Sequence, residues 1–242
     1  MTETPAITLR YFDCRGRIQH IRYYLKLRNI AFIDSRVPLS DGYAAWQQIK
    51  HDQRQTGPFL KLPVMHWGSQ QIAESAVIHD WLHRKLGDEA KLSEEENLQH
   101  AMVASSCRSE LMIPLGTLLY QDLAHPASDI AIGGRATLQQ ISGHLQVMEA
   151  ALVQWQWFDK LLHRSLMITD CLLWEWLSLV DTVFAGQVDW KALPQLHHFF
   201  QHCQSAPLFR RMLAEHACPI TGRPQEAEAL QRLHAALAAT PV

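Results

Sequence analysis

All the strand-like stretches of this chain lie before residue 74, and everything after them has a helical pattern. Ile7–Phe12 is a short apolar run that predicts a strand, and residues 17–28 carry apolar side chains at helical spacing. Residues 30–37 alternate and end before Pro38, which predicts a second strand. A strand, a helix and a strand in this order predict a right-handed βαβ unit with parallel strands.

The next fifty residues complete an α/β pattern. Residues 42–53 predict a short helix, and residues 62–65 and 70–73 predict two strands around a tight hairpin at Gly68. Residues 74–86 are again helical in spacing. The order of elements in this region is therefore βαβαββα.

The rest of the chain contains no convincing strand. Pro114 is expected to kink the first helix of this region, and residues 125–134 read as a loop. We therefore expect an α/β domain over residues 1–86, a linker over 87–92 and an all-helical domain over 93–242. The expected helices cover residues 93–123, 135–154, 169–183, 194–204 and 208–215, with a final amphipathic helix over 224–239.

Composition and charge exclude several classes of protein. Hydrophobic residues make up 48% of the 242 residues and the net charge is −2, so neither disorder nor nucleic-acid binding is expected. No apolar run approaches the roughly 20 residues that cross a bilayer, and the first residues do not resemble a signal peptide. The five cysteines are odd in number and widely spread, which favours a reducing cytoplasm.

Four stretches resemble the glutathione transferases, and in particular the sigma-like members on the tyrosine-using sigma, mu, pi and alpha side of that family. The stretches are "LRYFDCRGRIQHIRYYLKLRNIAFIDSRV" from Leu9, "WQQIK" from Trp46, "KLPV" from Lys61 and "ESAVIHDWL" from Glu74. The resemblance implies a thioredoxin-like N-terminal domain followed by an all-helical C-terminal domain. It also implies a homodimeric enzyme that joins the thiol of its co-substrate glutathione to hydrophobic electrophiles, without a metal.

Two side chains in the first stretch compete for the chemistry. The resemblance places Tyr11 as the catalytic residue, whose hydroxyl would donate a hydrogen bond to the glutathione sulfur and lower a thiol pKa that starts near ~8.5. Arg17 would add positive potential, with Arg15 as a second candidate. Cys14 is the alternative, because thiolates are stabilised near helix N-termini and a cysteine here could form mixed disulfides. It is followed by Arg-Gly-Arg, however, and not by the Pro-Phe or Pro-Tyr of such sites.

The resemblance assigns glutathione binding to three pairs of residues. The first pair would hold the glycine carboxylate with an ammonium and an indole N–H on one helical face. The second would offer the backbone of the residue before a cis-proline to the cysteinyl backbone. The third lies at a helix N-terminus, which favours the γ-glutamyl carboxylate. The first pair is Trp46 and Lys50, the second is Leu62 and Pro63, and the third is Glu74 and Ser75.

The helical region offers weaker signals. His198 and His202 have the i, i+4 spacing of a metal pair but no third ligand in sequence, so we expect no metal site. Asp170 resembles the buried aspartate of a folding motif in the family, but Met167 stands where Ser or Thr is usual, so the usual capping box is not expected and Thr169 is left to compensate. The second substrate is expected to contact Met102, Ser105, Ser106, Arg108 and Met112.

Two further functions remain open at this point. The chain could bind glutathione without catalysing a reaction, or it could be a specialised isomerase, as some sigma members are. A fold alone does not distinguish these functions from conjugation.

Overall fold

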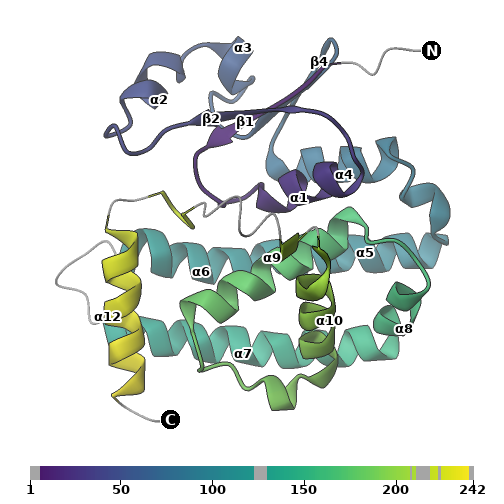
Figure 1. Ribbon diagram of the computed structural model, residues 1–242, viewed down its shortest axis with the longest axis vertical. Coiled ribbons are helices and arrows are strands. Elements are labelled where there is room, and N and C mark those ends of the chain that lie inside the picture. Colours follow the sequence, from purple (N-terminus) through teal and green to yellow (C-terminus); the bar gives the residue numbers. More distant parts are fainter. Residues whose placement is uncertain (1–5, 123–129, 208, 211–218, 223–224, 240–242) are drawn as a thin grey trace. The chain divides into compact units, whose positions relative to one another are not determined.

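The chain divides into two compact units (Figure 1). The first contains residues 1–92 and 215–224, and the second contains residues 93–214 and 225–242. The computed structural model describes residues 6–122, 130–207, 209–210, 219–222 and 225–239. Within these described ranges, no helix has both the length and the hydropathy needed to cross a membrane.

The first unit is built on a four-stranded sheet with the order β2-β1-β3-β4. β1 runs parallel to β2, which confirms the predicted βαβ unit, and β3 pairs antiparallel with both β1 and β4. The predicted hairpin between β3 and β4 turns at Gly68, whose φ is 59°. The strands are β1 (Ile7–Phe12), β2 (Ile33–Val37), β3 (Val64–Trp67) and β4 (Gln70–Ala73).

Four helices accompany this sheet. α1 (Gln19–Leu27) and α4 (Ser75–Lys85) cover one face, and the short α2 (Ala44–Ile49) and α3 (Gln53–Thr56) lie on the other side (Figure 1). The helix predicted over residues 42–53 is confirmed over Ala44–Ile49, but it ends earlier than predicted and a second helix begins at Gln53. The carboxylate of Asp52 accepts a hydrogen bond from the backbone N–H of Arg54, which caps a new helix and separates α3 from α2. A short 3₁₀ turn, η1 (Glu89–Lys91), follows α4.

The second unit begins with a long helical stretch of changing pitch. α5 (Glu94–Ser106) passes into a π-helical segment, η2 (Cys107–Met112), then into α6 (Ile113–Thr117), and a second π-helical segment, η3 (Leu118–Asp122), follows. Pro114 lies in the first turn of α6. Because proline has no N–H, the regular α-helical bonding cannot continue through it, and wider turns accommodate the missing bond.

The centre of the second unit is α9 (Ile168–Val183), in which 14 of the 16 residues are buried and against which α5, η2 and α10 (Pro194–Ser205) pack. Residues 130–134 belong to a helix, so the predicted loop is wrong there, and α8 was not predicted. The helix expected over 208–215 lies largely outside the described residues. The other elements are α7 (Ile130–Gln154), α8 (Trp157–Leu162), η4 (Trp190–Ala192) and α12 (Glu226–Ala238).

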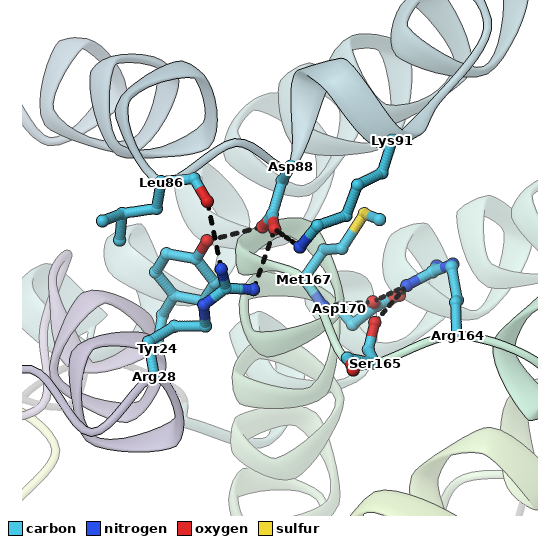
Figure 2. Close-up of polar contacts among 9 residues, drawn as sticks. All are labelled: Tyr24, Arg28, Leu86, Asp88, Lys91, Arg164, Ser165, Met167 and Asp170. Carbon is cyan, nitrogen blue, oxygen red and sulfur yellow. Dashed lines mark hydrogen bonds and ion pairs between the residues drawn. The ribbon is translucent and has the colours of Figure 1, made fainter.

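The start of α9 is capped by its own carboxylate, although Met167 replaces the usual Ser or Thr. The Met167 backbone N–H donates to Asp170 Oδ2 at 2.8 Å. Arg164 donates through Nη1 and Nη2 to the two carboxylate oxygens of Asp170 at 2.5 and 3.0 Å (Figure 2). The carboxylate half of a capping box therefore forms, and Arg164 supplies a partner that the sequence pattern did not indicate.

Candidate functional site

Tyr11 lies at the end of β1 and is 6% exposed. Its hydroxyl oxygen accepts a hydrogen bond from the backbone N–H of Arg17 at 3.3 Å. A tyrosine hydroxyl has a single proton, so an oxygen that accepts here can donate its own proton to a different acceptor. The local geometry thus leaves the Tyr11 hydroxyl able to act as a hydrogen-bond donor.

The electrostatics keep this hydroxyl neutral. Burial above all, and the nearby Cys14, raise the pKa of Tyr11 from 10.0 to about 12, although the hydrogen bond and charge of Arg17 and the charge of Arg22 act in the opposite direction. The side chain therefore carries its proton throughout the neutral pH range. Its chemistry is that of a donor and not that of a tyrosinate base.

Gly16 makes the packing around Tyr11 possible. A Cβ atom at Gly16 would lie 2.6 Å from the hydroxyl oxygen and 2.7 Å from Cε1 of Tyr11, and the φ of Gly16 is +45°. Only glycine fits both the conformation and the space. The sequence shows a glycine in "RGR", in a strand-to-helix loop. The sequence alone does not reveal that this glycine contacts the Tyr11 ring.

The loop after β1 is held from within the first unit by Arg22, which is 2% exposed. Its guanidinium donates to the backbone carbonyls of Cys14 at 2.7 Å and Phe12 at 3.3 Å, and it forms an ion pair with Asp34 at 3.1 Å. Cys14 is itself buried. Arg22 therefore holds the loop next to Tyr11 in place, and the sequence pattern did not indicate this role.

Of the two residues expected around the glycine carboxylate, Trp46 lies on α2 and Lys50 directly follows its last residue. The ring of Trp46 packs edge-on against Phe12, the neighbour of Tyr11, with centroids 5.4 Å apart. The Lys50 backbone N–H donates to the Trp46 carbonyl at 2.9 Å, so one helical turn separates the two side chains. The structure thus brings α2 against the end of the strand that carries Tyr11.

The other two expected pairs lie at the start of β3 and of α4. The Leu62-Pro63 bond is cis, as the sequence pattern predicted. Glu74 precedes the first helical residue, Ser75, and has a φ of 68°, which is uncommon for a residue other than glycine. No side chain caps α4 at Glu74, so the N-terminal N–H groups of this helix are a favourable place for an anion.

The residues proposed for the second substrate lie in α5 and η2. Met102 and Ser106 line a cavity of about 200 Å³ together with residues of α7, including His144, whose Nε2 lies 2.7 Å from Ser106 Oγ. Burial lowers the pKa of His144, and the charge of Glu110 opposes this. Ser105, Arg108 and Met112 do not line this cavity.

His198 and His202 line a separate groove of about 220 Å³ with Asp159 on α8. Among the residues that the structure describes, no three His, Cys, Asp or Glu side chains form a group that could hold a metal ion.

Comparison with known proteins supports the assignment of the fold. No protein-family model matches the chain. It is 31% identical to glutathione S-transferase 4 of Caenorhabditis elegans over 99 residues, which are 41% of this chain and only 44% of that protein. It is 25% identical to glutathione S-transferase 1 of Ascaris suum over 223 residues, 87% of this chain and 97% of that protein.

A solved structure adds the three-dimensional likeness. A monomeric glutathione S-transferase of the hookworm Necator americanus superposes with a TM-score of 0.71 at 19% identity, covering 87% of this chain and 97% of that one. The chain therefore has the glutathione S-transferase fold, with a thioredoxin-like first unit and a helical second unit.

Proposed function

We propose that this chain, which belongs to the glutathione S-transferase family, conjugates the thiol of glutathione to electrophilic small molecules, and that Tyr11 activates the thiol. The observation that carries this proposal is the Tyr11 hydroxyl, which accepts a hydrogen bond from the Arg17 N–H. Its own proton is thus available for another acceptor, and its raised pKa keeps that proton in place.

In this mechanism Tyr11 donates a hydrogen bond to the sulfur of bound glutathione. The bond stabilises the thiolate more than the thiol, so the thiol loses its proton to solvent at a lower pH. The exposed Arg17 adds positive potential next to the anion. The thiolate then attacks the electrophilic carbon of the second substrate and forms the thioether.

The three pairs around Tyr11 bind the tripeptide. Lys50 and Trp46 hold the glycine carboxylate, and the backbone of Leu62 before Pro63 pairs with the cysteinyl residue as an added strand. The start of α4 binds the γ-glutamyl carboxylate through Ser75, and the carboxylate of Glu74 receives the γ-glutamyl amino group. The uncapped N-terminus of α4 and the uncommon backbone of Glu74 support this arrangement.

The test is the Tyr11→Phe variant, assayed with glutathione and an aryl halide. Loss of one hydrogen bond to a charged sulfur is worth about 1.5–3 kcal/mol, so kcat/KM should fall roughly 10- to 100-fold. The acidic limb of the pH profile should move to higher pH. Tyr43→Phe, which removes the hydroxyl of an exposed tyrosine, is the matched control. Equal activity of the Tyr11→Phe and control variants would refute the role of Tyr11.

A second candidate is a thiol transferase that uses Cys14, because Cys14 lies close enough to influence the Tyr11 hydroxyl. In that case Cys14→Ser abolishes activity towards mixed disulfides, and Tyr11→Phe has little effect. A protein that only binds glutathione would show binding by calorimetry and no turnover with any electrophile in a panel.

We also propose a cytoplasmic homodimer. Support comes from large apolar side chains exposed on both units, including Phe59 in the first and Met102 and Val147 in the second. Cys14, Cys107, Cys171 and Cys203 are not joined in disulfides, as expected in a reducing compartment. Light scattering should give twice the chain mass of 27.7 kDa. The Necator americanus protein is described as monomeric. A measured mass equal to that of one chain would contradict the proposed dimer.

A further inference from the structure

A short segment near the C-terminal end of the chain, in the first unit, contacts the loop that follows β1, the strand that carries Tyr11. We propose that residues 219–222 are a positioning element for the reaction: they hold the loop after β1 so that Tyr11 can donate to the glutathione sulfur. This inference rests on the proposed function and adds to it a part of the chain more than 200 positions away.

Two consecutive backbone hydrogen bonds attach the segment to the loop. The Arg15 N–H donates to the Pro219 carbonyl at 2.9 Å, and the Gly16 N–H donates to the Ile220 carbonyl at 3.3 Å. Ile220 and Thr221 are buried. Buried backbone groups need partners, so these bonds fix the position of the loop from outside its own sequence.

The segment is also packed tightly against the loop at Gly222. The φ of Gly222 is +74°, and a Cβ atom there would lie 2.5 Å from Cδ1 of Leu39, 3.3 Å from the carbonyl oxygen of Asp13 and 3.5 Å from Cβ of Cys14. Only glycine combines this backbone conformation with this close approach.

The contacts reach Tyr11 through the next residues of the loop. Gly16, which donates to Ile220, lies directly against the Tyr11 ring, and Arg17 donates its N–H to the Tyr11 hydroxyl. A shift of Gly16 therefore moves both the surface under the ring and the N–H that orients the hydroxyl. Small misplacements of a reacting group lower rates strongly, whereas the residues proposed to bind glutathione lie on other elements.

The experiment compares Gly222→Ala with Gly186→Ala. Both glycines have a φ of +74°, but a Cβ at Gly186 would meet nothing within 4 Å. The two variants therefore share the backbone cost and differ in the contact with the loop. Gly222→Ala should lower kcat about tenfold, with the acidic limb of the pH profile shifted upward and the KM for glutathione within about twofold. Gly186→Ala should leave all three unchanged.

A rescue variant separates positioning from general damage. The shortest overlap at Gly222→Ala is with the Leu39 side chain, so adding Leu39→Ala removes it. The double variant should recover most of the lost kcat and the original pH profile. Equal effects of Gly222→Ala and Gly186→Ala, or a loss in the double variant as large as in the single one, would overturn the proposal.

Amide hydrogen exchange distinguishes failure of this inference from failure of the proposed function. In the protein without substrate, the amides of Arg15 and Gly16 should be protected, and Gly222→Ala should speed their exchange at least tenfold while Gly186→Ala does not. If wild-type protein neither binds nor conjugates glutathione, the proposed function fails, and the exchange data still decide whether the segment holds the loop. Unprotected amides in the wild type would overturn the inference.

Discussion

The two buried carboxylates in Figure 2, Asp88 and Asp170, are equally inaccessible to solvent but differ in where their partners lie along the chain. Asp170 is held by Arg164 and Met167, which are six and three positions away. Asp88, in the first unit, accepts from the nearby Lys91 at 3.3 Å, but also from the Tyr24 hydroxyl at 2.5 Å and from Arg28 at 3.2 Å, which are 64 and 60 positions away. One carboxylate completes a helix end, and the other joins segments that are remote in sequence.

The candidate site resembles Asp88, because residues remote in sequence hold it in place. Its loop is held by Val37, Pro219 and Ile220, whose carbonyls accept from Asp13, Arg15 and Gly16. Such contacts leave no pattern near the residue that they position. The comparison therefore predicts that substituting a group held by nearby residues destabilises one stretch of chain. Substituting a group held by remote residues should destabilise several stretches.

The largest expected effect is that of Asp170→Ala. It removes a buried acceptor and leaves the Arg164 guanidinium, whose side chain is 15% exposed, without its anion. Breaking a buried pair in this way costs about 3–5 kcal/mol. Denaturant unfolding measures the loss, and exchange should speed up only around the start of α9. Asp159→Ala, an exposed acid on α8, is the control and should stay within about 0.5 kcal/mol. A loss no larger than the control contradicts the prediction.

Asp88→Ala should cost less, about 2–3 kcal/mol, because its cations can be hydrated once released. The side chains of Arg28 and Lys91 are 25% and 49% exposed. The effect should, however, be more widespread. Hydrogen exchange should increase both at the end of α1 and in the segment around Asp88. An increase confined to one of these two segments would break the comparison between the two carboxylates.

The smallest effect is expected at Glu96, at the exposed start of α5, which has one local partner and one on α8. Glu96 accepts from the Ser93 N–H and pairs with Lys160, and these contacts lower its pKa from 4.5 to about 2. Because the folded pKa is the lower one, this stabilisation is complete above about pH 4.5 and is lost as the pH falls towards 2. Glu96→Gln should therefore cost about 0.5–1 kcal/mol at pH 7.

Unfolding at several pH values checks this prediction. The gap in unfolding free energy between wild type and Glu96→Gln should narrow as the pH falls from 4.5 towards 2, because Glu96 becomes protonated over this range whereas Gln is uncharged at every pH. A gap that is the same at pH 2 and pH 7 would mean that the charge of Glu96 does not stabilise the cap.

Local patterns predicted most of the elements. The βαβ unit, the hairpin at Gly68 and the long helix α9 follow from periodicity and turn residues, which act within a few positions. The π-helical segments around Pro114 were not predicted, because a proline pattern indicates a missing bond and not how neighbouring turns absorb it. The start of α7 was also missed, since Gly133 and Gly134 favour a loop locally. In the structure Gly134 lies against Leu233 of α12, where a Cβ would be 2.5 Å from Cδ1.

The sequence by itself determined where Tyr11, Lys50 and Ser75 stand in their elements, because strand ends, helical spacing and helix starts are local properties. The tertiary structure alone decided that Gly16 lies against the Tyr11 ring, that Arg22 is buried among loop carbonyls, and that residues 219–222 complete the loop. The physical reason is that a backbone hydrogen bond between distant residues depends on chain packing, and the identities of the two residues do not specify it.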